Sequence, residues 1–297
     1  MAEGKIIMKR CYLVTTEHLE EGLWFRDEED FRVGMNHVAI EAGRQPEVIV
    51  LAFTLMSNHL HFVLGGEKEA VAQFVEGLKR SYSMYLNRRY GTREFLRRNK
   101  TDVREIAAED EALERAIAYV QMNSVAANIC SHPSQYPWGT GSAFFDSGHR
   151  HGTQLGRLSA RARKRLMHSD RCTCPGHWMV GEGGYVLPRE YVQVSAVENL
   201  FRTPARMNYF LKTSSKARRR LETGEEKSPA FRDHIILGAL PDLLRSLFQK
   251  ETFRELTVDE KTELLRQVRF RFSADINQVA RVCGVTYAEA ARMFDGV

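Results

Sequence analysis

The stretch Met56-Ser57-Asn58-His59-Leu60-His61-Phe62-Val63-Leu64 decides how the first half of this 297-residue chain folds. Its apolar run is typical of a strand. Because successive strand side chains point to opposite faces, His59 and His61 share one face, while Leu60, Phe62 and Leu64 share the other. The apolar face can pack on a core while two neutral imidazoles converge, which is half of a metal site. A solvated strand face carries the same pattern, so the flanking sequence has to decide between these interpretations.

The sequence around this stretch predicts an α+β domain. The predicted elements are, in order, a strand at 9–16, a helix at 27–42, a strand at 47–56, the histidine strand, a helix at 68–90, a strand at 102–106 and a helix at 109–123. Only Ser57 and Asn58 separate the two central strands, which predicts an antiparallel hairpin. This order favours an antiparallel sheet with helices packed on it.

Composition limits the class of protein. Hydrophobic residues make up 43% of the chain and charged residues 27%, as in ordinary globular proteins. The net charge of +5 permits an anionic partner such as nucleic acid without requiring one. Five cysteines and the absence of a secretory leader or of a long apolar run predict a cytoplasmic protein that does not span a membrane.

Two polar residues of the predicted 109–123 helix complement the histidines. Tyr119 and Asn123 are four residues apart and therefore point the same way. A tyrosine phenol is a possible nucleophile, and an amide carbonyl oxygen suits a hard divalent cation. Taken alone, Tyr119 fits an ordinary packed helix residue as well.

Four blocks of the sequence resemble, in order, the HUH (His-hydrophobic-His) single-tyrosine transposases, and most closely the REP-associated tyrosine transposases. The blocks are Trp24–Phe31, Leu55–Leu64, Tyr82–Gly91, and Tyr119–Ala127 with the following Tyr136-Pro137-Trp138. Together they cover about residues 8–145. The chain has Ser57 and Ser124 where the family usually has proline, and Gly139-Thr140 where it usually has two serines.

The resemblance implies a ferredoxin-like or RRM-like catalytic domain with its site residues. His59 and His61 correspond to metal ligands, Tyr119 to the catalytic nucleophile and Asn123 to the third ligand. It further implies Mg²⁺ or Mn²⁺ as cofactor and single-stranded or hairpin DNA as substrate. The expected reaction is cleavage through a 5′-phosphotyrosine, which a 3′-hydroxyl can reverse to join strands. The resemblance also leaves room for a homodimer and for association with the nucleoid.

Basic residues after the second predicted helix suggest phosphate contacts. Arg88, Arg89, Arg97 and Arg98 lie in a stretch that also contains aromatic residues, a combination that suits single-stranded DNA. A solvated charged face explains the same residues equally simply.

The end of the chain predicts a second DNA-binding element. Residues 273–294 have an apolar helical stripe, Gly284 at a turn, and a capping box from Thr286 to Glu289, as in a helix-turn-helix. The candidate base contacts are Thr286, Tyr287 and Arg292. An ordinary αα-hairpin is the alternative.

We therefore expect three parts: an HUH catalytic domain at 1–147, a basic linker or variable segment at 148–190, and an all-α extension at 191–297. Cys172, Cys174 and His177 lie in the middle part, but their spacing does not match common zinc knuckles. The predicted function is metal-dependent DNA cleavage and strand transfer. The alternatives are a DNA-binding regulator that no longer cuts and a metallohydrolase that uses water instead of Tyr119.

Overall fold

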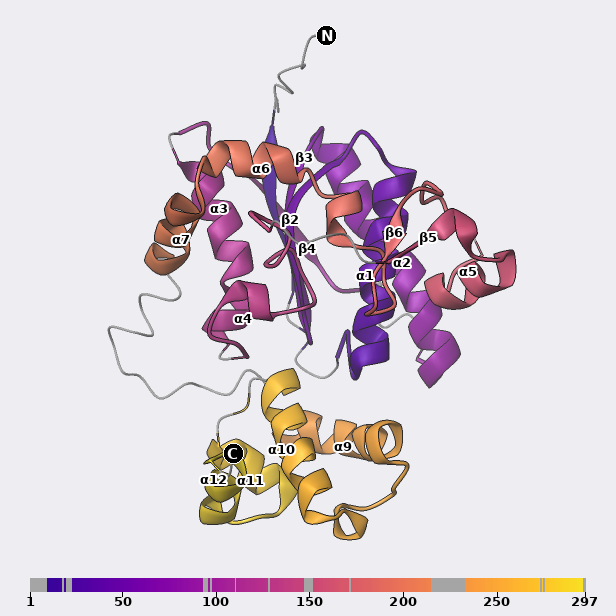
Figure 1. Cartoon of the computed structure of the whole chain (residues 1–297), viewed down its shortest axis with the longest axis vertical. Coiled ribbons are helices and arrows are strands. Elements are labelled where there is room, and N and C mark those ends of the chain that lie inside the picture. Colours follow the sequence, from indigo (N-terminus) through magenta and orange to yellow (C-terminus); the bar gives the residue numbers. More distant parts are fainter. Residues whose placement is uncertain are drawn as a thin grey trace.

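The computed structural model describes most of the chain (Figure 1). The described residues are 10–17, 19, 23–92, 96, 98–109, 111–127, 129–146, 152–170, 172–214, 233–272, 274 and 276–295.

A four-stranded antiparallel sheet forms the centre of the larger part. Its strands are β1 (Cys11–Thr16), β2 (Ile49–Met56), β3 (His59–Gly65) and β4 (Thr101–Glu105), in the spatial order β2-β3-β1-β4. Met56 pairs with His59, so Ser57 and Asn58 form the two-residue turn of the predicted hairpin. Every residue of β3 is buried, because helices cover both faces of this strand.

Helices lie on both faces of the sheet. In Figure 1, α1 (Glu28–Arg44) and α2 (Lys68–Tyr90) lie on one side of the sheet, and α3 (Ala112–Gln121) lies on the other. The Asp27 carboxylate starts α1 by accepting a 3.0 Å hydrogen bond from the amide of Asp30, as expected of an N-cap. Gly91 ends α2 with a φ of +68°, a conformation that glycine adopts without strain. The predicted α+β class is confirmed for this part.

The other described residues form mainly helices, together with two short strands. These elements are α4 (Asn123–Ala126), β5 (Thr153–Gln154), α5 (Ala160–Met167), β6 (Met179–Val180), α6 (Val194–Phe201), α7 (Pro204–Thr213), α9 (Asp233–Phe248), α10 (Val258–Phe272), α11 (Ile276–Cys283) and α12 (Tyr287–Asp295). Short 3₁₀ helices lie at Pro133–Gln135, Leu155–Arg157, Pro188–Glu190 and Phe253–Glu255. None of the helices in the described ranges is long and apolar enough to span a membrane.

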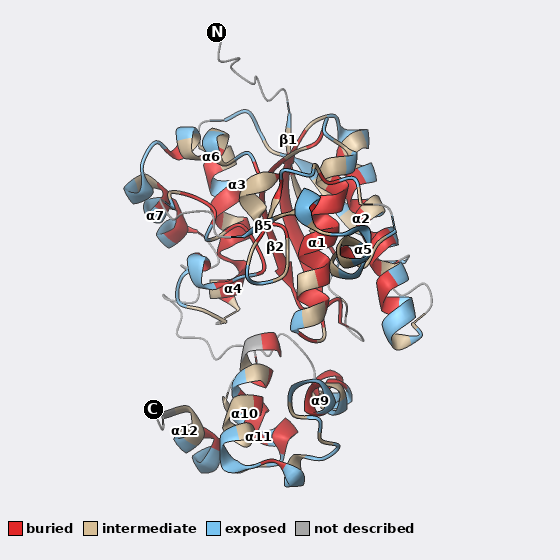
Figure 2. Cartoon of the chain, turned by 45° about the vertical axis from the view of Figure 1, so that its right-hand side comes forward, coloured by how far each residue is buried: buried red, intermediate tan, exposed pale blue. Residues whose placement is uncertain are grey.

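The buried residues form two hydrophobic cores (Figure 2). The first surrounds the sheet and extends to Leu211, and the second joins α9, α10, α11 and α12. Leu23 is the exception in sequence, since it precedes α1 but packs in the second core.

The segment expected to be a linker is packed against α1. The Asn36 side-chain amide donates to the carbonyls of Leu166 and Gly184 at 3.1 and 3.2 Å, and its oxygen accepts from the amide of Val186 at 3.0 Å. Helices α6 and α7 also pack on the first core, although the sequence pattern groups them with the C-terminal helices. The division of the chain into domains at 147 and 190 stays a prediction.

A buried histidine joins α1 to α2. The Ser81 hydroxyl donates to the Leu78 carbonyl at 3.1 Å and lies 2.9 Å from His37 Nδ1, so it accepts the Nδ1 proton of a neutral imidazole. Burial lowers the pKa of His37 to about 3, against a usual 6.5.

We expect His37 to make the protein less stable as the pH falls from 6.5 towards 3. Over this range the unfolded chain binds a proton at His37 and the folded protein does not, which lowers the free energy of unfolding by about 1.4 kcal/mol per pH unit. His37→Asn can keep a donor towards Ser81 without titrating, and it should flatten the curve of unfolding free energy against pH in urea titrations. His177→Asn, at an exposed position, is the control. Parallel curves for wild type and His37→Asn would contradict this role.

Candidate active site

The two histidines of β3 face α3 and lie against each other. Both are buried, with 6% of His59 and 1% of His61 exposed, and their ring centroids are 4.6 Å apart at an interplanar angle of 86°. The shared face follows from the strand period of two, as the sequence predicts. The structure therefore brings two convergent imidazoles under a covering helix.

Polar neighbours orient each imidazole through Nδ1. His59 Nδ1 lies 2.7 Å from Asn58 Oδ1, which can only accept, so this nitrogen carries the proton and Nε2 the lone pair. His61 Nδ1 lies 3.1 Å from the Thr15 hydroxyl, whose oxygen can accept in the same way. Hydrogen bonds of this kind orient metal-ligating histidines. The turn and β1 thus prepare both rings to present Nε2.

Tyr119 lies beside this pair. Helix α3 packs on β2 and β3, and the Thr54 hydroxyl holds it by donating to the Val120 carbonyl at 2.9 Å. The Tyr119 ring meets the His61 ring edge-on, with centroids 5.6 Å apart. Burial raises the pKa of the Tyr119 phenol above its ordinary value, and the Arg104 guanidinium works against this shift. An additional cation near the ring would favour the phenolate further.

Asn123 follows Tyr119 by one turn but belongs to another helix. The sequence predicts one helix over 109–123, whereas α3 ends at Gln121 and Asn123 opens α4. The Asn123 amide nitrogen donates to the carbonyls of Tyr119 and Val120 at 2.9 and 3.2 Å. Its carbonyl oxygen is the atom that it can offer to a cation.

The metal-ligating residue types are sparse. Within the described ranges, no three His, Cys, Asp or Glu side chains gather in a group that could hold a metal ion. Cys174 is buried while His177 is exposed, so the zinc interpretation of their loop gains no support. Any cation site at β3 therefore needs oxygen ligands of another kind beside His59 and His61.

One of the predicted DNA contacts has a structural role. Arg89 pairs with both Asp27 and Asp30, with 2.7 Å from Nη1 to Asp30 Oδ1. The hydroxyls of Tyr85 and Tyr90 also donate to Asp30, at 2.7 and 3.0 Å. Two carboxylates compensate the charge of Arg89, so it has less charge to offer to a phosphate, and its contact with DNA stays a prediction. Arg88 and Arg98 are exposed and remain candidates, and Arg97 lies outside the described residues.

The residues around Asp30 come from two of the four sequence blocks. Asp27 and Asp30 come from the Trp24–Phe31 block, whereas Tyr85, Arg89 and Tyr90 come from the Tyr82–Gly91 block. The two blocks contact each other across the start of α1 and the end of α2. Sequence reasoning missed this pairing, although the joint presence of both blocks was a signal for it.

The C-terminal helices reach the histidine hairpin. The Ser57 hydroxyl donates to the carbonyl of Arg271 at the end of α10, and both residues are buried. Arg26 and Asp242 form a second link, with 3.4 Å between Nη1 and Oδ2. The turn before His59 is therefore held by residues of the second core.

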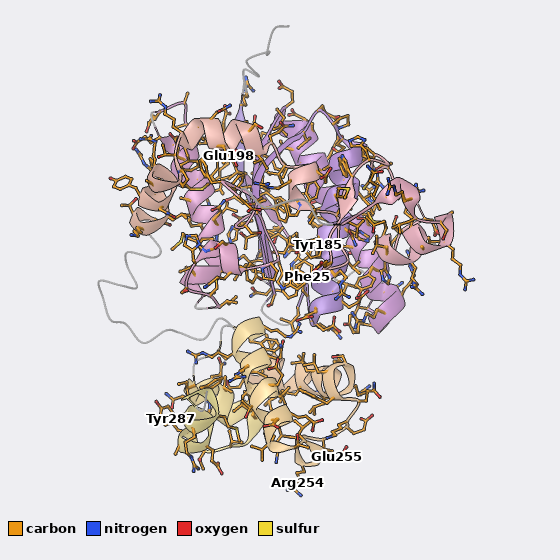
Figure 3. The ribbon with its side chains drawn as sticks, in the orientation of Figure 1. Phe25, Tyr185, Glu198, Arg254, Glu255 and Tyr287 are labelled. Atoms are coloured by element: carbon orange, nitrogen blue, oxygen red, sulfur yellow. The ribbon has the colours of Figure 1, made fainter. Side chains whose placement is uncertain are left out.

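The structure places the candidate contacts of the last two helices on the outside of the molecule. Gly284 joins α11 to α12 with a φ of +68°. The predicted capping box is confirmed, since the Thr286 amide donates to Glu289 at 2.8 Å and the Glu289 amide to Thr286 at 3.2 Å. Tyr287 is 55% exposed and lies at the outer edge of the helices in Figure 3. Arg292 lines a hollow between α10 and α12.

One comparison with known proteins gives a match. The family model described as "Transposase IS200 like" matches residues 24–101. This match supports the IS200-like transposase family for residues 24–101. This transposase segment contains both histidines and both halves of the Asp30 cluster, and it ends before Tyr119 and Asn123. No curated protein and no solved structure matches the chain.

We expect Ser57→Ala to loosen the contact between the C-terminal helices and the transposase segment. The change leaves a buried carbonyl without its donor, which costs about 1–3 kcal/mol. Hydrogen exchange should become faster at the 57–59 turn and at the end of α10. Ser246→Ala is the matched control, because that hydroxyl donates at 3.3 Å to a carbonyl of its own helix. Unchanged exchange at the turn would show that this bond does not hold the two cores together.

Proposed function

We propose that the protein cleaves and rejoins single-stranded DNA, with Tyr119 as the nucleophile. The observation that carries this proposal is the edge-on contact between the Tyr119 and His61 rings, 5.6 Å apart, beside His59. A phenol next to two convergent imidazoles has the composition of a tyrosine nuclease site. The match to IS200-like transposases supports a DNA-processing activity of the transposase type.

The residues present fit a divalent cation, Mg²⁺ or Mn²⁺. His59 and His61 would supply Nε2 atoms, since their Nδ1 atoms face Asn58 and Thr15, and Asn123 would supply its carbonyl oxygen. This mixed nitrogen and oxygen set suits a hard or borderline ion better than a thiolate-binding one. When bound, such an ion polarises a phosphoryl oxygen and helps to orient the scissile phosphate.

The chemistry of Tyr119 then follows from its position. The phenol loses its proton, its oxygen attacks phosphorus, and the bond from phosphorus to the 3′-oxygen breaks as that oxygen takes up a proton. The products are a 5′-phosphotyrosine and a free 3′-hydroxyl. Attack by another 3′-hydroxyl reverses the step, so strands can be joined without a separate energy source.

The substrate in this proposal is unpaired or hairpin DNA. The attack needs an exposed phosphate that leaves room for helix α3, which carries Tyr119. This requirement favours single strands over duplex DNA. Helices α11 and α12 would act as a helix-turn-helix on neighbouring duplex, with Tyr287 as an exposed candidate contact. The capping role of the Thr286 hydroxyl reduces its value as a base contact. A cytoplasmic, nucleoid-associated location and a homodimer belong to the same proposal.

The decisive test is a covalent adduct. Protein, Mn²⁺ and labelled single-stranded hairpin DNA should give a labelled band that survives denaturation, and EDTA should abolish it. Tyr119→Phe should form no adduct, because it lacks the attacking oxygen. His59→Ala and His61→Ala should each reduce the rate by about 100-fold or more, the scale expected for loss of a cation-holding or charge-stabilising group. Tyr209→Phe, at a tyrosine that is 60% exposed, is the matched control and should behave as wild type.

Other outcomes would identify the alternatives. An adduct that persists in Tyr119→Phe would refute the assignment of the nucleophile. Cleavage without an adduct would indicate hydrolysis by water. Tight duplex binding without cleavage, in all metals tried, would favour a DNA-binding regulator.

A further inference from the structure

The sheet face that carries the histidines has a covered and an uncovered part. Helix α3 packs on β2 and β3, whereas β1 presents the half-buried Leu13 and Thr15 on the same face. At the edge, β4 presents Asp102 and Arg104, whose side chains are 52% and 76% exposed. A DNA strand that reaches Tyr119 can therefore cross β1 and β4.

The strand register places Arg104 near the candidate site. Thr15 pairs with His61 on one side and with Asp102 on the other, so these three side chains form one row across the face. Arg104, Leu13 and Val63 form the next row on the same face. Two strand spacings are about 10 Å, a distance that an arginine side chain and a phosphate together can bridge.

A phosphate can easily replace Asp102, the present partner of Arg104. Its Nε lies 2.6 Å from Asp102 Oδ2 in an exposed ion pair. Such pairs contribute little to stability because water and salt screen them. The planar guanidinium fits a phosphate with two parallel hydrogen bonds, which an ammonium group cannot provide.

We propose that Arg104 is a catalytic residue that binds the scissile phosphate, and that Asp102 holds its side chain until DNA arrives. This inference rests on the proposed cleavage by Tyr119. In the attack, the bond from the Tyr119 oxygen to phosphorus forms and the bond to the 3′-oxygen breaks. The guanidinium stabilises the negative charge on the non-bridging oxygens without gaining or losing a proton.

The test measures the rate of adduct formation at saturating DNA, together with DNA affinity. Arg104→Ala should slow the adduct by about 100-fold, the usual effect of removing one preorganised charge-stabilising group. Affinity for the same DNA should change only a few-fold. Arg104→Lys should recover part of the rate.

Arg10→Ala is the matched control, because Arg10 also forms an exposed ion pair on these strands, 3.9 Å from Glu105. It should retain the wild-type rate and affinity. A wild-type rate for Arg104→Ala would overturn the assignment, as would equal losses of rate and affinity. Failure of the wild-type protein to form any adduct would instead reject the proposed function. Thermal melts of the variants check the fold, which a largely exposed side chain should not disturb.

Discussion

The register of β3 between β1 and β2 is the constraint on which the candidate site depends. A shift by one residue would turn both histidines towards α1 and α2 and place Leu60 and Phe62 under α3. The two-residue turn prevents this shift by fixing Met56 opposite His59. On the far face, the Phe53 and Phe62 rings, 5.8 Å apart, hold the same pairing through apolar contact. The polar site and the hydrophobic core are thus two consequences of one ladder of hydrogen bonds.

The same register also gives the two buried imidazoles their hydrogen-bond partners. A buried polar group without a hydrogen bond destabilises the folded state, so the residues around His59 and His61 have to be polar at chosen positions. Asn58 precedes His59 in the turn, and Thr15 lies opposite His61 on β1. Both partners engage Nδ1, and the ring orientation is therefore set by the fold before any ligand binds. Tyr119 meets rings whose positions are already fixed.

Much of this arrangement could be predicted from local sequence. The hairpin, the shared face of the histidines and the long α2 helix follow from periodicities within a few residues. The contact of Tyr119 with His61 could not be derived in this way, and only the family resemblance indicated it. The ion pairs of Arg89 could not be predicted either, because its partners Asp27 and Asp30 lie about sixty residues earlier in the chain. The packing of Leu166, Gly184 and Val186 around Asn36 was missed for the same reason, since no local pattern encodes a long-range hydrogen bond.

The role of Ser57, at a position where the family usually has proline, becomes clear only from a contact far along the chain. Proline has no side-chain donor, whereas the Ser57 hydroxyl donates to the Arg271 carbonyl, 214 positions away. The serine stands two residues before His59, so the second hydrophobic core is attached directly to the turn that positions the histidines. Leu23 strengthens this attachment by packing in that core from the N-terminal side. If α11 and α12 hold DNA, buried contacts would connect those helices to the turn that positions the histidines. If the proposed duplex binding holds, the position of the candidate site relative to that duplex would depend on both cores.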